Sequence, residues 1–167
     1  MRVVVTQDRP DVFWRYTVIG SDLLWRLSYQ MKALADGAGR SACGLSKVLY
    51  FDPAQKRAWL YAYPERERRW LAGNTLCYYK EVWRKHPFPN LNDGEDTRFV
   101  WSLPETAILA LADHTFYAAT VHRNNTSPKR TNDPRWLPRP IDQIQSMLGH
   151  DLHFYETWPA EKSLAVA

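Results

Sequence analysis

The segment 86–99 determines where one helix of this chain begins, because a turn is followed directly by acids and then by apolar residues. Residues 92–94, Asn-Asp-Gly, favour a turn, since Asn and Asp tolerate left-handed geometry and Gly adopts a positive φ at no steric cost. Apolar residues then recur at helical spacing, at Phe99, Val100 and Leu103. With Pro104 as a natural stop, the sequence predicts a helix whose first turn carries Glu95 and Asp96.

These two acids have two interpretations. Carboxylates in the first turn of a helix are stabilised by the helix dipole and by free N–H groups, so both can simply cap the helix. A carboxylate kept ionised there can also accept a proton from a hydroxyl group, as a general base does. Acids are common in first turns, so local physics alone favours capping.

The rest of the pattern predicts one α/β domain, 1–167, in which strands and helices mix irregularly. One helix is expected to end at 36–37 and to have the apolar face Leu23, Leu27, Met31 and Leu34. Strands are expected at 43–51, 59–63, 76–79 and 116–121, with one or two short ones in 1–19 and an edge strand at 152–155. Further helices are expected at 80–85 and 141–149, a polar loop at 126–140, and either structure at 108–112.

Composition places the chain among globular proteins, with 167 residues, 45% hydrophobic content and eight tryptophans. No apolar run approaches the length that spans a bilayer, and the first residues lack the apolar core of a signal peptide. Cys43 and Cys77 each lie in an apolar, strand-like stretch, which favours buried free thiols over a disulfide or a metal site. We therefore expect a cytoplasmic location, with peripheral association with a membrane as the alternative.

The formal net charge is +4, and much of the excess lies after His122. The basic residues there are Arg123, Lys129, Arg130, Arg135 and Arg139, opposed only by Asp133. Such a loop suits a diphosphate, although it can equally be a solvated surface. Signs are mixed at 65–69, so a nucleic-acid partner is not expected.

Three segments, in this order, resemble motifs of bacterial family 2 glycosyltransferases. Residues 70–78 (Trp-Leu-Ala-Gly-Asn-Thr-Leu-Cys-Tyr) are similar to a segment that precedes the acceptor-side motif of that family. Residues 94–97 (Gly-Glu-Asp-Thr), with Pro-Phe-Pro before them and Phe-Val-Trp after them, resemble that motif itself. Residues 117–122 and 124–129 resemble the closing strand and the His-containing loop.

The resemblance implies a truncated GT-A-like fold, a mixed sheet flanked by helices. Residues 23–167 would form its acceptor-side half, and 1–22 would be a divergent N-terminus. In the family a nucleotide-binding half precedes this region, so we expect the donor pocket to be incomplete unless a second chain or another copy supplies it. A partial fold also exposes a sheet edge, which predicts self-association.

In inverting members of the family, one carboxylate removes the proton of an acceptor hydroxyl as the bond between sugar and diphosphate breaks. By its place in the motif Asp96 would be this base, and Glu95 would orient the acceptor or hold the helix start. A divalent cation, Mn²⁺ or Mg²⁺, would be bound by His122. Asp22 is the one acid left where the family carries several, and His122 can equally be structural.

The resemblance also implies contacts to both substrates. Gly73, Asn74 and Thr75 would line the acceptor cleft, since Gly permits close approach and the polar pair can bond sugar hydroxyls. Trp70 would stack on a sugar ring or, alternatively, belong to the core. Lys129 and Arg130 would reach the diphosphate.

Three functions follow, in decreasing order of support. The first is inverting transfer of a sugar from a nucleotide diphosphate donor to a saccharide or other hydroxyl acceptor. The second is a non-catalytic protein that keeps the acceptor cleft and binds a glycan or a protein partner. The third, a small basic nucleic-acid binder, is the least favoured.

Overall fold

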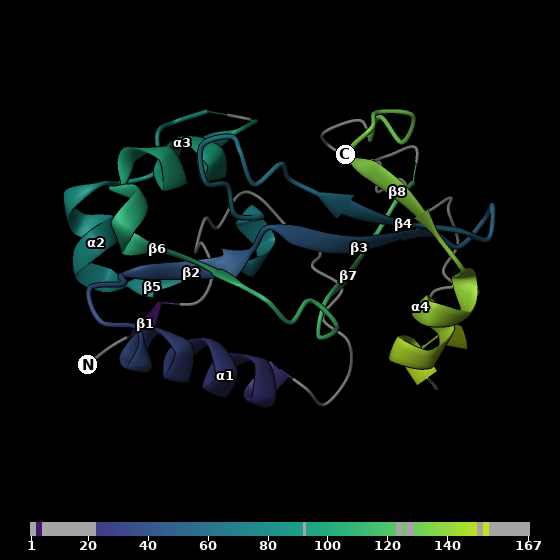
Figure 1. Cartoon of the computed structure of the whole chain (residues 1–167), viewed down its shortest axis with the longest axis horizontal. Coiled ribbons are helices and arrows are strands. Elements are labelled where there is room, and N and C mark those ends of the chain that lie inside the picture. Colours follow the sequence, from purple (N-terminus) through teal and green to yellow (C-terminus); the bar gives the residue numbers. More distant parts are fainter. Residues whose placement is uncertain are drawn as a thin grey trace, which may run out of the picture.

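The computed structural model describes residues 3–4, 23–91, 93–122, 125, 129–149 and 152–153. They form a mixed α/β fold in which two four-stranded sheets lie end to end and helices flank them (Figure 1). Both sheets contain parallel and antiparallel pairs, so the expected mixed α/β class is confirmed. Within 1–19 only one short strand falls in the described residues, and Asp22 lies outside them.

The first sheet has the strand order β1-β5-β2-β6. Strand β2 is its centre, parallel to β6 and antiparallel to β5. The run 108–112, ambiguous from its period, is therefore a strand. The bounds are β1 Val3–Val4, β5 Cys77–Tyr79, β2 Ala42–Leu45 and β6 Ile108–Leu111.

The second sheet has the strand order β7-β3-β4-β8. Strand β3 is parallel to β7 and antiparallel to β4, whose other edge is covered by β8. The bounds are β7 Ala118–Thr120, β3 Lys47–Asp52, β4 Arg57–Ala62 and β8 Trp136–Arg139. Strand β8 lies inside the segment 126–140 that was expected to be a loop. Pairing with β4 makes it a strand despite its proline, which an edge strand tolerates.

The expected single strand 43–51 is two strands that belong to different sheets, with Ser46 between them. The hydrogen-bonding partner changes at this residue. Ala72 N–H donates to the carbonyl of Leu45 at 2.8 Å, whereas Tyr63 N–H donates to the carbonyl of Ser46 at 3.1 Å. Residues 64–71 lie outside the sheets, between these two hydrogen-bonding partners. The run 42–52 therefore belongs to the first sheet before Ser46 and to the second sheet after it.

Helices flank both sheets (Figure 1). Helix α1 packs against β2 and β5, and α4 packs against β3 and β4. Short 3-10 turns, η2 and η3, precede β5 and β6. The bounds are α1 Leu23–Asp36, α2 Lys80–Lys85, α3 Glu95–Ser102, α4 Ile141–Leu148, η2 Gly73–Thr75 and η3 Glu105–Ala107.

Helix α1 spans the expected residues, and Leu34 is buried in the core as predicted, but another part of the buried face differs from the prediction. Met31, expected to be apolar core, is 41% exposed, whereas Arg26 and Gln30 are buried. The reason is a polar partner, because Gln30 Nε2 donates to the carbonyl of Thr75 at 2.7 Å. Hydrophobic periodicity cannot detect such a face, since the residues that carry it are polar.

Helix α3 confirms the prediction made from segment 86–99. It begins at Glu95, directly after Gly94, whose φ of 77° is left-handed. Phe99 and Val100 are buried, and Phe99 stacks on Phe88 with ring centroids 4.4 Å apart. This apolar anchor holds the first turn of α3, with its two acids, in a defined place.

The second sheet presents two different faces. Helix α4 covers one of them through Ile144 and Leu148, which pack against Leu49, Phe51, Ala58 and Leu60. The opposite face carries aromatic rings, among them Tyr50, Trp59 and Trp136. Because side chains alternate along a strand, each strand contributes to both faces. The aromatic face is the one on which the candidate site lies.

Two smaller expectations are also decided. Cys43 and Cys77 are buried free thiols, as predicted, and lie opposite each other in the β2–β5 pair. Leu152 and His153 are helical, so the edge strand expected at 152–155 is wrong for them, while the rest of it lies outside the described residues. Among the helices that the structure describes, none is long and apolar enough to cross a membrane.

Candidate functional site

Asp96 lies directly against the backbone of Gly73. A Cβ atom built on Gly73 would lie 2.0 Å from Oδ2 of Asp96, far inside van der Waals contact. The other oxygen, Oδ1, accepts the N–H of Thr97 at 2.6 Å. Two segments that sequence analysis selected separately, 70–78 and 94–97, therefore meet at this point. Only glycine at position 73 allows this approach.

Trp70 joins the same two segments. Its indole Nε1–H donates to Oγ1 of Thr97 at 3.1 Å, so the ring is held beside the first turn of α3. The ring also stacks on Tyr63, with centroids 5.3 Å apart and planes 26° apart. Tyr61 meets it edge-on at 5.4 Å. Trp70 is thus an anchored, half-buried ring rather than a fully buried core residue.

A cavity of about 290 Å³ opens beside Trp70 on the aromatic face of the second sheet, and we call it the aromatic cavity. Among the described residues, four aromatic and four charged side chains line it. The lining residues are Tyr50, Tyr61, Trp70, Lys129, Arg130, Asp133, Arg135 and Trp136. Apolar walls with a few convergent charged groups are typical of small-molecule sites.

The rings of the aromatic cavity are packed at angles to one another. Trp136 is tilted by 49° against Tyr50 and by 65° against Tyr61, with centroids 4.7 and 5.4 Å apart. Tyr61 in turn makes an angle of 69° with Trp70. Tilted and edge-on pairs are the arrangement that ring quadrupoles favour, so this wall is preformed.

One acid and one base of the aromatic cavity neutralise each other. Arg135 Nε and NH2 donate to the two carboxylate oxygens of Asp133, each at 2.9 Å. This bidentate pair lowers the pKa of Asp133 to about 2. Arg135 also lies 5.7 Å from the ring centre of Tyr61. Of the cavity's cations, Lys129 and Arg130 remain outside this pair.

Asp96 is not a wall of the aromatic cavity, but its charge acts on two residues that are. Burial raises the pKa of Tyr50, and the neighbouring Tyr61 and the carboxylate of Asp96 raise it further. Burial lowers the pKa of Lys129, while Asp93 and Asp96 oppose that shift. The Lys129 ammonium lies 6.0 Å from the ring centre of Tyr50. The carboxylate is therefore half-buried and within electrostatic reach of these two residues.

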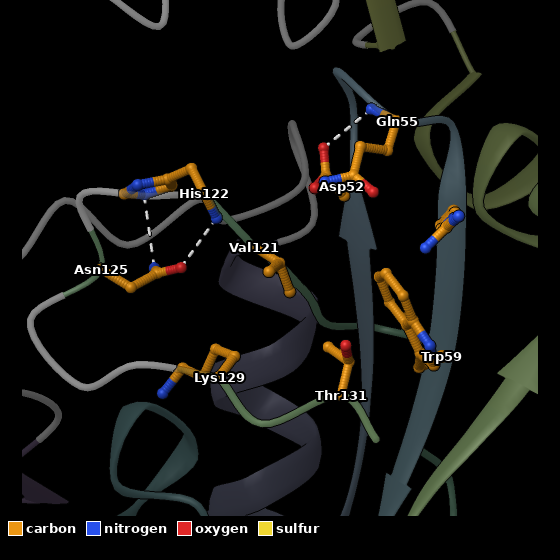
Figure 2. A pocket seen from close by; sticks show the side chains of 9 residues that line it. Asp52, Gln55, Trp59, Val121, His122, Asn125, Lys129 and Thr131 are labelled. Carbon is orange, nitrogen blue, oxygen red and sulfur yellow. Dashed lines mark hydrogen bonds between the residues drawn. The ribbon is translucent and has the colours of Figure 1, made fainter.

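A second cavity, of about 350 Å³, lies at the other side of Lys129, and we call it the His122 cavity. Figure 2 shows His122 and Asn125 on one side of it and Asp52, Gln55 and Trp59 on the other. His122 is exposed, and its backbone N–H donates to Oδ1 of Asn125 at 2.7 Å. Lys129 thus lines both cavities.

The predicted metal site is not assembled by the described residues. Within that part of the chain, no three His, Cys, Asp or Glu side chains come together to hold an ion. Asp52 lines the His122 cavity, yet its Oδ1 accepts the N–H groups of Ala54 and Gln55, both at 2.9 Å, and so closes a turn. Asp22, the other expected ligand, lies outside the described residues.

Asn74 and Thr75, the polar residues beside Gly73, form hydrogen bonds within the protein. Asn74 donates from Nδ2 to the hydroxyl of Tyr117. Thr75 is buried, and its Oγ1 accepts the N–H of Leu45 at 2.9 Å and donates to the carbonyl of Ala72 at 2.8 Å. These bonds hold η2 against the β2–β3 strand. Their effect is to hold Gly73 in place.

Sequence analysis missed three of the four rings that line the aromatic cavity, namely Tyr50, Tyr61 and Trp136. One signal for them existed, because aromatics at 59, 61 and 63 alternate and so share one face of β4. Trp136 and Asp133 gave no such signal, since they lie in a Pro-rich segment expected to be a loop. Their place depends on the pairing of β8 with β4.

Searches against protein-family models, curated proteins and solved structures gave no match for this chain. The resemblance to family 2 glycosyltransferases therefore stays a prediction from its three motifs. Two of those motifs meet at the contact between Gly73 and Asp96.

Proposed function

We propose that this chain has a GT-A-like fold and transfers a sugar, with inversion, from a nucleotide diphosphate donor to an acceptor hydroxyl. Asp96 is the general base. The observation that supports the proposal is the contact of Asp96 with Gly73, because it brings this carboxylate into the segment of Trp70, which lines the aromatic cavity and donates to Thr97, the neighbour of Asp96. An acceptor in the aromatic cavity would have its hydroxyl groups near this carboxylate.

In the proposed reaction Asp96 only has to accept a proton from the acceptor hydroxyl, so its position is its main requirement. The acceptor hydroxyl loses its proton to the carboxylate while its oxygen forms a bond to the anomeric carbon. The bond between that carbon and the diphosphate breaks, and the electron pair leaves with the diphosphate. Asp96 lies in the first turn of α3, where the helix dipole favours acidic side chains. Such a base contributes about 10²–10⁴-fold to the rate.

Lys129 is the residue best placed to act on the diphosphate, since it lines both cavities. A cation there offsets the negative charge that develops on the leaving group. Arg130 lines only the aromatic cavity, so of the two residues expected at the diphosphate it is the less suited.

A divalent cation at His122 remains a prediction from the resemblance. Mn²⁺ and Mg²⁺ take several oxygen ligands, whereas the described residues offer one exposed imidazole and a carboxylate oxygen already used in a turn. This donor set does not fit a hard cation by itself. No step of the proposed reaction is therefore assigned to a metal.

Replacing Asp96 tests the proposal. We expect Asp96→Asn to lower the release of UDP or GDP from nucleotide sugars, measured with saccharide acceptors, by about 10²-fold or more. Asp142→Asn is the matched control, because Asp142 also lies in the first turn of a helix, α4. Each substitution should change stability by about 1 kcal/mol or less. Equal loss of activity in both variants, or a large loss of stability in Asp96→Asn alone, would point to capping.

A non-catalytic glycan-binding protein is the second candidate. It is favoured by the aromatic cavity, which four aromatic and four charged residues line within the described part of the chain. Calorimetry with UDP or GDP and Mn²⁺ separates the two functions. Heat from a nucleotide supports the transferase, whereas saccharide binding without any nucleotide binding supports the second candidate.

A further inference from the structure

We propose that the aromatic cavity selects an anionic saccharide, whose ring packs on Trp70 and Tyr61 and whose acidic group is bound by Arg130 together with Lys129. This inference rests on the proposed function, since it defines the class of acceptor. The recognised chemistry is a sugar ring bearing a carboxylate or a phosphate.

Charge is the first argument. Three cations and one carboxylate line the cavity, and that carboxylate is bound by Arg135 through two hydrogen bonds of 2.9 Å. Within the described part of the chain, neither Lys129 nor Arg130 forms an ion pair. Cations beside an apolar wall favour a ligand that combines an apolar face with a negative group.

The same cations argue against a positively charged ligand. An aromatic cage can bind an ammonium group through the faces of its rings. Here Lys129 already lies 6.0 Å from the centre of Tyr50, and Arg135 lies 5.7 Å from the centre of Tyr61. A cationic ligand would find Tyr50 and Tyr61 already in contact with Lys129 and Arg135, and these two cations would repel it.

Ring geometry favours a sugar over a nucleobase. Among the ring pairs in the wall, Tyr61 is inclined by 69° to Trp70 and by 65° to Trp136. These described ring pairs do not hold a flat base between two parallel faces, so a base would stack on one ring only. A saccharide needs only one apolar C–H face against an aromatic surface, together with polar groups at its rim.

The position of the acidic group follows from the surrounding carboxylates. Asp93 and Asp96 both act on Lys129, and Asp96 would repel a second negative charge placed beside it. Arg130 is exposed, and the carboxylate on which its charge acts is Asp133, which Arg135 already binds through two hydrogen bonds. The acidic group is therefore expected at Arg130, which leaves the neutral hydroxyls of the ring toward Asp96.

Binding of a matched pair of sugars tests this. Methyl β-glucuronide and methyl β-glucoside differ only at C6, where the glucuronide has a carboxylate and the glucoside a hydroxymethyl group. The indole N–H signal of Trp70 reports the binding of either sugar in NMR titrations of the full chain. We expect the glucuronide to bind about tenfold tighter, and added salt to weaken only the glucuronide. Glucose 6-phosphate, in a parallel titration, shows whether a phosphate serves as well as a carboxylate.

Two arginine variants assign the preference to a residue. Arg130→Ala should reduce glucuronide affinity to that of the glucoside. Arg139→Ala, the control, removes an exposed arginine of β8 that does not line the cavity, and should leave the preference intact. Because both residues are exposed, neither change should unfold the protein.

Three results would overturn the inference: equal affinity for the two glycosides, no saturable binding of either, or tighter binding of uridine monophosphate at Trp70. Its failure is distinguishable from that of the proposed function. Transfer to neutral acceptors that depends on Asp96 would refute only the anionic preference. A glucuronide preference in a protein without transfer would refute only the catalysis.

Discussion

At position 73 the lack of a side chain decides where Asp96 lies. The carboxylate occupies the space that any Cβ would need, with Oδ2 2.0 Å and Asp96 Cβ 2.5 Å from the position of that atom. A tight approach of this kind makes two residues, 23 positions apart in the sequence, depend on each other. The general base of the proposed reaction is thus positioned by the glycine at position 73.

A double-mutant cycle measures this dependence. We expect Gly73→Ala to lower stability by about 1–3 kcal/mol, because the methyl group forces Asp96 out of its place. In an Asp96→Gly background the same change should cost about 0.5 kcal/mol or less, since the clashing atoms are gone. Urea denaturation of the four proteins gives the coupling. Equal costs in both backgrounds would show that the contact does not constrain Asp96.

At the scale of elements, helix α1 and turn η2 form one unit held by polar groups. Gln30 bonds the carbonyl of Thr75 and accepts the Nε–H of Arg26 at 3.1 Å, and Arg26 donates to the carbonyl of Asn74 at 2.8 Å. All of these bonds are wholly or partly buried, where an unmade bond is costly. They explain why α1 turns polar residues inward and Met31 outward.

Two neighbouring residues of α1 test this unit. Gln30→Ala should destabilise the protein by about 2–4 kcal/mol, because it leaves a cavity and an unpaired carbonyl at Thr75. Met31→Ala, one position along, should cost about 0.5 kcal/mol or less, since that side chain is 41% exposed. Chemical denaturation monitored by circular dichroism compares them. A larger destabilisation by Met31→Ala than by Gln30→Ala would contradict this unit and would support the apolar face that periodicity predicts.

Across the whole molecule, the two sheets share a single core. One cluster of buried residues contains Cys43 and Cys77 of the first sheet together with Trp59 and Trp136 of the second. The strand that passes through Ser46 joins the same two sheets covalently. Shared packing of this kind makes separate unfolding of either sheet unfavourable, so we expect one cooperative unit.

The thiols and the tryptophans report on this cooperativity independently. We expect alkylation of Cys43 and Cys77 in increasing urea to follow the same transition as tryptophan fluorescence, because both thiols are fully buried in the folded state. A thiol that reacts at clearly lower urea would show that the first sheet opens on its own. The buffer must contain a reductant that carries no thiol, so that Cys43 and Cys77, which lie opposite each other, do not form a disulfide before alkylation.

Local patterns predicted most elements but not their partners. The turn and acids of 92–96 predicted the start of α3, and the apolar runs predicted β4, β5 and β7, because caps and periodicity act within a few residues. The break at Ser46 and the strand β8 were missed. Both depend on hydrogen bonds to segments far away in the sequence, which no local pattern contains.

The sequence alone determined which residues belong together in motifs, namely Trp70 with Gly73 and Asp96 with the helix it begins. Only the tertiary structure decided that these motifs touch, and that Tyr50, Tyr61 and Trp136 form a cavity beside them. The physical reason is the sequence distance over which the interactions act. Turn and helix signals arise from neighbouring backbone groups, whereas a cavity is made by the packing of strands that are brought together only by the completed fold.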